Sequence, residues 1–324
     1  MMKITSRDDQ LEIATPAKVN LFLELLKRRD DGFHEIETVM SGVALYDHLR
    51  FLPRDDAEIR LAIRYATQGH QPAEQDDIPA DDRNLICKTF ELVRSIATDN
   101  GQKDSCARGV DIQLLKNIPS AAGLGGASSN SAAALIAANR IWKLHWSRER
   151  LVEIAAQLGS DIAFFLTGGT AFCRGRGERV ESISAPAGIP LVIAKPSDSL
   201  STAQVFSNVK LDSKNANSLG HQSSTALAHS VQTGRVPAMG RQLFNRLQEF
   251  ARPLSSQISK MEIEFGRVNC LGHQMSGSGS SYFGLFSNSK CARLAAISLS
   301  SRLPNVRIFC THTLSHTWPT LSSG

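Results

Sequence analysis

A glycine-rich segment at residues 118–129 constrains the fold more than any other feature of the sequence. It reads IPSAAGLGGASS and holds three glycines, three alanines and three serines. An apolar run at 110–115 precedes it and predicts a strand, and a small-residue run at 130–138 follows it and predicts a helix. A loop without bulky side chains at the start of a helix leaves backbone N–H groups accessible to an anion. The segment therefore favours a nucleotide phosphate site over a plain tight turn.

Two common phosphate-binding motifs do not fit this segment. A Walker A loop requires a lysine and a Ser or Thr directly after the second glycine, and no lysine follows these glycines. The dinucleotide fingerprint requires Gly-x-Gly-x-x-Gly after the first strand of a βαβ unit, whereas Gly123, Gly125 and Gly126 have a different spacing. The chain is expected to bind phosphate through another type of loop.

Composition indicates a soluble protein with two domains of ordinary size. The chain has 324 residues, 42% of them hydrophobic and 21% charged. Its net charge of +5 is scattered and is not concentrated in basic blocks with aromatic residues, so nucleic acid is not an expected partner. The first residues lack the apolar core of a signal peptide, and no apolar run approaches the roughly 20 residues that span a bilayer. We expect a cytoplasmic protein without membrane contact.

The six cysteines lie far apart and form no Cys-x-x-Cys pair. This spacing argues against a structural zinc site and against a disulfide scaffold. His312 and His316 have i, i+4 spacing but lie in a tail rich in Thr and Ser, so zinc is not expected there either. No side chain is assigned as a metal ligand.

Hydrophobic periodicity predicts alternating strands and helices. Asp55 to Asp82 is expected to form a hairpin and surface loop, and Asn208 to Gly234, with little apolar periodicity, a loose excursion. Ser147 and Ser160 are expected to cap helices, and Trp142 and Trp146 are expected to pack. The predicted strands are 19–25, 35–39, 49–52, 110–115, 170–183 with a turn, 191–194, 282–286 and 306–310; the predicted helices are 85–96, 130–138, 151–158, 161–166, 241–250, 254–265 and 292–299.

Two further segments accompany the glycine loop. A lysine, Lys18, enters an apolar strand in PAKVNLFL at 16–23, and a second glycine-serine loop, SGSGS, occupies 276–280. With 118–129 between them, they resemble the three motifs of the GHMP small-molecule kinases, in the same order. The resemblance implies an α+β fold with a ribosomal protein S5 domain 2-like N-terminal domain at 1–186, containing a left-handed βαβ unit, and a ferredoxin-like C-terminal domain at 187–324.

The resemblance also implies the catalytic residues. Asp161 follows Leu158-Gly159-Ser160, which is similar to the family's Leu-Gly-x-Asp, and that aspartate is the proposed general base. Lys18 matches the lysine that holds the base and the hydroxyl in register and stabilises the developing alkoxide. Without the family match, Asp161 reads as an exposed acid at a helix start and Lys18 as a solvated lysine at a strand edge.

ATP and Mg²⁺ are the cofactors that the resemblance implies, bound between the two domains. Ser128 and Ser129 are candidates for contact with phosphate or Mg²⁺, or for capping the helix. The nucleotide-binding residues are expected to be Pro119, Ser120, Ala121, Ala122, Gly123, Leu124, Gly125, Gly126, Ala127, Ser128 and Ser129.

The acceptor side resembles one branch of this family. The segment DDGFHEI at 30–36 is similar to that of the members whose small-molecule substrate is a cytidine diphosphate-linked methylerythritol. Stacking of a base on Phe33, His34 and Phe206 would contribute about 1–3 kcal/mol per contact, with core packing as the alternative role of these rings. Asn20 and Thr202 are candidate hydrogen-bonding residues for the substrate, and Ser276 and Gly277 are expected to support the pocket.

The chain departs from the family pattern at four places. Phe33 stands where Tyr is frequent, Ala127 where Gly is commoner, Asn130 where Asp is frequent, and Ser280-Ser281 where Pro-Thr is frequent. A neutral Asn130 weakens any metal role of that side chain.

Two alternatives stay open at this stage. One is another GHMP kinase, acting on homoserine, mevalonate or a sugar, and the other is a nucleotide-binding regulator without catalysis. Gly32-Phe33-His34 favours a cytosine-containing substrate over the first alternative, and the presence of both Lys18 and Asp161 argues against the second. The expected oligomeric state is a monomer or a weak homodimer.

Overall fold

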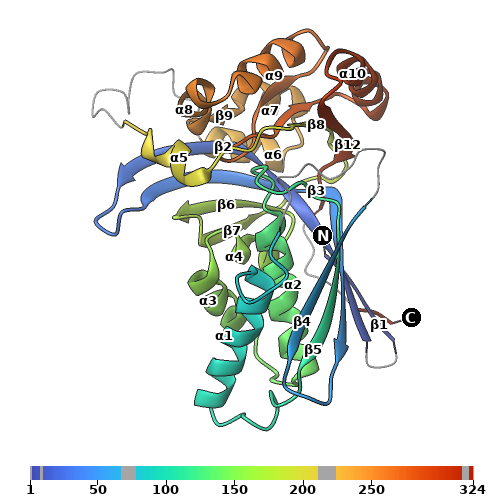
Figure 1. Ribbon diagram of the computed structural model, residues 1–324. Helices are drawn as coiled ribbons and strands as arrows, with labels where there is room; N and C mark the ends of the chain where they lie inside the picture. Colours follow the sequence, from blue (N-terminus) through green and yellow to red (C-terminus); the bar gives the residue numbers. More distant parts are fainter. Residues whose placement is uncertain (1, 8–9, 67–77, 211–223, 316–320, 324) are drawn as a thin grey trace.

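The computed structural model describes residues 2–7, 10–66, 78–210, 224–315 and 321–323. Its strands form a nine-stranded sheet and a four-stranded sheet, with the helices packed on their faces (Figure 1). The larger sheet runs in the order β13-β1-β2-β3-β5-β4, and β6, β7 and β9 extend it off this path. The mixed architecture confirms the predicted α+β class.

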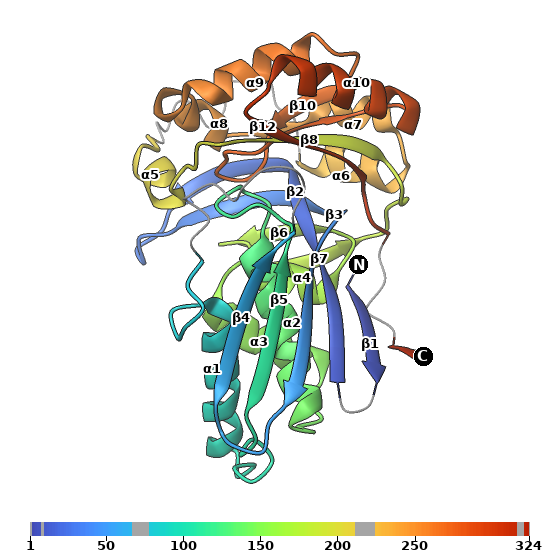
Figure 2. The ribbon, with the colours of Figure 1, turned by 45° about the vertical axis from the view of Figure 1, so that its right-hand side comes forward.

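Two long strands connect the lower and upper parts of the molecule. β2 (Gln10–Arg28) and β3 (His34–Pro53) pair antiparallel along nearly their whole length and pass beneath the smaller sheet (Figures 1 and 2). The predicted strands at 35–39 and 49–52 are parts of this single β3. They are continuous because residues 40–43 and 46–48 between them keep their pairing with β2, which periodicity alone does not report.

The remaining strands of the larger sheet flank this hairpin. β5 (Val110–Lys116) pairs with the second half of β3, and β6 (Thr170–Gly175) pairs with the first half. β4 (Ile59–Tyr65) lies in the segment that was expected to form a hairpin and surface loop and pairs parallel with β5; residues 67–77 of that segment lie outside the described part. The other strands of this sheet are β1 (Lys3–Arg7), β7 (Arg179–Ile183), β9 (Phe244–Asn245) and β13 (Leu321–Ser323).

Four helices cover this sheet: α1 (Leu85–Asp99), α2 (Gly126–Ile141), α3 (Arg148–Leu158) and α4 (Ile162–Thr167). Ser147 caps α3 as predicted, because its hydroxyl accepts a hydrogen bond from the Arg150 N–H. The predicted cap at Ser160 is wrong. Asp161 is the residue before α4, and its side chain makes no capping hydrogen bond.

The core beneath the sheet is built on large aromatic side chains. Phe90 of α1 is buried, with its ring centroid 5.9 Å from that of Phe51 and 5.5 Å, edge-on, from that of Trp142. Trp142 donates its indole N–H to the Arg108 carbonyl, and Trp146 donates its own to Gln102. Both tryptophans therefore pack as predicted.

The smaller sheet forms the ferredoxin-like unit. β8 (Pro190–Pro196) lies between β11 (Tyr282–Leu285) and β12 (Val306–His312), and β10 (Gly272–Met275) is at the edge, giving the order β10-β11-β8-β12. α9 (Ser256–Gly266) lies in the chain connection from β8 to β10, and α10 (Ser289–Arg302) lies in the connection from β11 to β12. Both helices lie on the outer face of this sheet (Figure 2), which is a split βαβ arrangement.

The segment between β8 and α9 differs from the prediction. Instead of one helix at 241–250, the chain forms α7 (Val236–Gln242), β9 (Phe244–Asn245) and α8 (Leu247–Ala251), followed by the 3₁₀ turn η2 (Arg252–Leu254). The helix is interrupted because β9 pairs with Phe22 and Leu23 of β2.

Two short helices precede this segment, α5 (Thr202–Ser207) and α6 (Ser224–Gln232). α6 lies in the segment 208–234, which was expected to be a loose excursion; it differs from that expectation because its Leu227 and Val231 are buried in a core cluster. Residues 211–223 lie outside the described part.

A domain boundary at residue 186 stays a prediction, since β9 and β13, which follow it, join the larger sheet. Within the described ranges, no helix is long and apolar enough to cross a membrane.

We expect Phe90→Ala to lower the free energy of unfolding by about 3–5 kcal/mol, because truncation leaves a cavity between Phe51 and Trp142. Chemical denaturation followed by circular dichroism measures the change. Ser95→Ala on the exposed face of the same helix is the control and should change stability by less than about 0.5 kcal/mol. Equal stabilities of the two variants would contradict this account of the core.

Candidate active site

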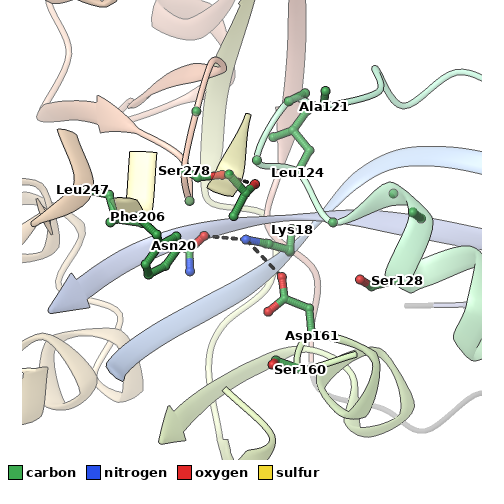
Figure 3. Close-up of a pocket in the computed structure, with 18 of the residues that line it drawn as sticks. Lys18, Asn20, Ala121, Leu124, Ser128, Ser160, Asp161, Phe206, Leu247 and Ser278 are labelled. Carbon is green, nitrogen blue, oxygen red and sulfur yellow. Dashed lines mark hydrogen bonds and ion pairs between the residues drawn. The ribbon is translucent and has the colours of Figure 1, made fainter. Parts of the chain in front are cut away.

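A cavity of about 1110 Å³ lies where the glycine loop, β2 and the 276–280 loop meet. It is lined by every residue that the sequence assigned to the site except Ser129 and Ser276. Figure 3 shows Phe206 and Leu247 on one side of Lys18 and Ser128 on the other. The structure thus brings together three segments that lie far apart in the sequence, at 16–23, 118–129 and 276–280.

Lys18 and Asp161 face each other in this cavity. The Lys18 side chain is only 5% exposed; its Nζ lies 3.4 Å from Asp161 Oδ2 and donates a hydrogen bond of 2.5 Å to Asn20 Oδ1 (Figure 3). Asn20 is held in turn by its Nδ2, which donates to Thr38 Oγ1 at 2.9 Å. A buried ammonium needs such partners, since desolvation of an unpaired charge is costly.

The Asp161 carboxylate is 32% exposed and points into the cavity from the start of α4. Because this side chain does not cap the helix, an oxygen is available for a ligand. A carboxylate beside a buried ammonium can accept a proton from a hydroxyl group bound between them.

The glycine loop packs against Lys18 at distances that only glycine permits. Gly123 and Gly125 both have φ of +70°; a Cβ on Gly123 would lie 2.0 Å from the Ser276 carbonyl oxygen, and one on Gly125 would lie 3.0 Å from Lys18 Cγ. Leu124, between them, accepts the Lys18 backbone N–H at 2.9 Å. The loop conformation and the position of the lysine are therefore set together.

The loop opens α2 as predicted. Gly125 precedes the helix in a left-handed conformation and provides no side-chain cap, so the first N–H groups of α2 are left for an anion. Ser128 lines the cavity, but Ser129 does not: its buried hydroxyl donates to the Pro16 carbonyl at 2.7 Å. Ser129 holds α2 against β2.

A buried ion pair that the sequence did not reveal supports the start of the glycine loop. Lys116 Nζ lies 2.7 Å from Asp47 Oδ2, and Asp47 Oδ1 accepts the backbone N–H groups of Asn117 and Ile118 at 2.7 and 2.8 Å. Asn130 donates to Asp47 at 3.1 Å and accepts from Thr15 at 2.8 Å. The Asn130 amide thus makes its hydrogen bonds within the protein. Among these residues, only Lys116, just ahead of the loop, was a signal in the sequence that could have indicated the ion pair.

The 276–280 loop supports the site from the opposite side. Ser276 donates its hydroxyl to the Gly123 carbonyl at 3.0 Å, and its Oγ accepts the Asn20 N–H at 3.4 Å. Asn245, which the sequence did not single out, donates to the carbonyls of Met275 and Gly277 at 2.8 Å each. Ser276 therefore supports the glycine loop without lining the cavity.

Aromatic side chains line the end of the cavity away from the glycine loop. The ring centroids of His34 and Phe206 are 5.4 Å apart with a tilt of 38°. The His34 pKa is lowered, because burial and the nearby Arg28 both disfavour its charged form. Thr202 hydrogen-bonds Ser278 at 2.8 Å across the same end. Phe33 is 53% exposed and stacks with Arg176, which sequence reasoning also missed.

We expect Gly123→Ala to destabilise the protein more than Gly101→Ala does. Both glycines have positive φ, where an alanine costs about 1–2 kcal/mol, but a Cβ on Gly101 meets nothing within 4 Å. Only the Gly123 variant adds a clash with the Ser276 carbonyl. Denaturant unfolding of the two variants measures the difference in stability. Equal losses of stability would show that the glycine loop and the 276–280 loop can move apart to accommodate the added Cβ.

Comparisons with known proteins agree with this geometry. Residues 84–169 match the family model described as GHMP kinases N terminal domain. The 4-diphosphocytidyl-2-C-methyl-D-erythritol kinase of Pelotomaculum thermopropionicum is 36% identical over 86% of this chain and 90% of its own, and that of Bacillus subtilis is 32% identical over 83% and 86%.

Solved structures give the same result. A crystal structure of 4-(cytidine 5'-diphospho)-2C-methyl-D-erythritol kinase superposes with a TM-score of 0.72 at 29% identity, covering 93% of this chain and 98% of its own. A homoserine kinase from Cytophaga hutchinsonii has a TM-score of 0.73 at 16% identity over 96% of each chain, which shows the shared fold. The chain belongs to the 4-diphosphocytidyl-2-C-methyl-D-erythritol kinase family of the GHMP kinases.

Proposed function

We propose that this protein transfers the γ-phosphoryl group of ATP to the 2-hydroxyl of 4-diphosphocytidyl-2-C-methyl-D-erythritol, giving the 2-phosphate and ADP. This is a step of the non-mevalonate isoprenoid pathway. The observation that carries the proposal is the pairing of Lys18 with Asp161 at 3.4 Å, in a cavity that reaches from a helix N-terminus to an aromatic end.

Phosphoryl transfer requires a positioned hydroxyl, a proton acceptor and neutralisation of charge. Asp161 is the group that accepts the hydroxyl proton, because its carboxylate is the exposed member of the pair. Lys18, fixed by Asn20, holds its positive charge beside the oxygen that loses the proton.

The nucleotide side of the cavity suits ATP. The backbone N–H groups at the start of α2 and the Ser128 hydroxyl are placed for the phosphates. Ile78, Ile86 and Leu114 line the cavity near the loop and provide apolar walls for a purine.

Mg²⁺ fits this arrangement as an ion carried by the nucleotide. In the described residues no three His, Cys, Asp or Glu side chains converge on a metal position. Mg²⁺ binds nucleotide sites through few protein ligands plus phosphates and water, so Ser128 and Asp161 are sufficient as protein oxygens near it. When bound, the ion would neutralise charge on the phosphates.

The aromatic end of the cavity suits a cytosine. His34 and Phe206 offer ring faces, and a neutral imidazole can hydrogen-bond a base as donor and acceptor. This end favours the cytidine-linked acceptor over homoserine, mevalonate or a sugar, which have no base to stack. A cytoplasmic location and a monomer or weak homodimer complete the proposal and rest on the sequence.

We expect Asp161→Asn to lower kcat by about 10²–10⁴-fold while ATP still binds, because the change removes the proton acceptor and keeps the shape. An ADP-release assay with Mg-ATP and the cytidine-linked acceptor measures turnover. Asp111→Asn, which affects an ion pair with Arg54 on the remote part of β5, is the control and should be active.

Two results would contradict the proposal in different ways. Full activity of the Asp161 variant would remove the role of this residue as base. A wild-type protein that phosphorylates homoserine, mevalonate or galactose, and not this acceptor, would keep the fold and change the substrate.

A further inference from the structure

The turn between β6 and β7 directs one arginine into the cavity. β6 ends at Gly175, β7 begins at Arg179, and the Gly177 N–H donates to the Arg174 carbonyl at 3.1 Å to close the turn. Arg176 lies at the tip and lines the cavity, whereas Arg174, two residues earlier, does not.

Glu178 fixes the backbone of this turn. Its carboxylate accepts the Arg176 backbone N–H at 2.6 Å, and a Cβ on Gly175 would come within 2.6 Å of the same carboxylate. The acid therefore binds the main chain at Arg176 and forms no ion pair with its guanidinium.

The two arginines of the turn have different surroundings. Arg174 lies 3.7 Å from Glu37 and 3.6 Å from Glu181, so its charge is compensated within the protein. Within the described ranges Arg176 forms no ion pair, and its guanidinium lies 5.0 Å from the centre of the Phe33 ring. Stacking on an aromatic face orients a guanidinium and leaves its N–H edge free for an anion.

Arg176 also lies between the two ends of the proposed acceptor. The adjacent Gly177 would place a Cβ 3.7 Å from Asp161 Oδ1, next to the position of the reacting hydroxyl. On its other side are Phe33 and, beyond it in sequence, His34 at the aromatic end. In a cytidine diphosphate-linked polyol, the ribose and the diphosphate lie between the base and the hydroxyl, and the diphosphate is the charged part of this stretch.

Of the polar groups near Arg176, His34 and Asp31 do not supply a positive charge for the diphosphate. Burial and the nearby Arg28 lower the pKa of His34, so both disfavour a positive charge on its ring. Asp31, on the turn that carries Phe33, is bound mainly by Arg29, whose Nε lies 3.0 Å from its Oδ2, and its electrostatic interaction with Arg176 is weaker. Arg28, exposed at the mouth of the cavity, is the other arginine among its described lining residues.

We propose, on the basis of the proposed function, that Arg176 binds the diphosphate of the acceptor and thereby selects a nucleoside diphosphate-linked substrate. Its planar guanidinium matches two phosphate oxygens at once, and Phe33 holds it in place by stacking. Phe33 then acts on the substrate through Arg176 as well as through any contact of its own with the base.

The test compares Arg176→Gln with Arg174→Gln, which removes the same charge from the same turn outside the cavity. Binding of CDP and of cytidine is measured by calorimetry, and KM values are measured for the full acceptor and for ATP. We expect Arg176→Gln to weaken CDP binding and to raise the acceptor KM tenfold or more. Cytidine binding and the ATP KM should stay within twofold, and Arg174→Gln should resemble wild type in all four.

Arg176→Lys separates charge from shape. Lysine keeps the positive charge and loses the planar fork, so we expect an intermediate loss of CDP affinity. Thermal unfolding of each variant shows whether the turn stays folded, and a variant that binds cytidine normally has an intact aromatic end.

Failure of this inference can be distinguished from failure of the proposed function. If wild type phosphorylates the acceptor and Arg176→Gln binds CDP within twofold of it, the inference is wrong and the function stands. The same conclusion follows if Arg28→Gln loses CDP affinity and Arg176→Gln does not. If wild type binds CDP through Arg176 but does not phosphorylate the acceptor, the function is wrong and the anion site stands.

Discussion

The burial of one ammonium group, that of Lys18, governs how the site is assembled. Withdrawn from water, it requires compensating partners, and Asn20 and Asp161 supply them from β2 and from the start of α4. The neighbouring backbone must also approach it closely: a Cβ on Gly125 would lie 3.0 Å from its Cγ, and one on Gly277 would lie 3.3 Å from its Nζ. The three sequence motifs converge because the two glycine-containing loops pack on the lysine of the third motif.

The long β2–β3 hairpin converts this local constraint into an extended binding site. Lys18 lies midway along β2, whereas Phe33 and His34 lie where the hairpin turns back into β3. In the proposed function, both ends of the acceptor are therefore bound by one paired ribbon, and the β2–β3 register fixes the distance between the two binding positions. The ferredoxin-like unit closes the cavity over this ribbon and is tied to it by β9 and by the ion pair of Arg246 with Glu24 at 2.7 Å.

Much of the site was predictable because its constraints are local. A loop of glycines before a helix, a lysine in a strand and an acid after Leu-Gly-Ser are visible in the chain, and the structure brings them together. Ser129 shows what helical geometry adds: consecutive helix residues point about 100° apart, so Ser128 and Ser129 cannot both face the ligand. The Asp47–Lys116 pair, the role of Asn245 and the break at β9 depend on residues far apart in sequence, for which periodicity carries no signal.

The unequal exposure of Lys18 and Asp161 follows from their different tasks. A charge that stabilises a developing anion is most effective when it is fixed and shielded from water, as the 5% exposed Lys18 is. A proton acceptor must instead reach a group that arrives with the substrate, and Asp161 keeps 32% of its side chain exposed because it does not cap α4. In the proposed mechanism the Lys18–Asp161 pair is thus complete before either substrate binds, and we assign substrate selection to the walls of the cavity: the His34–Phe206 rings and the turn that carries Arg176.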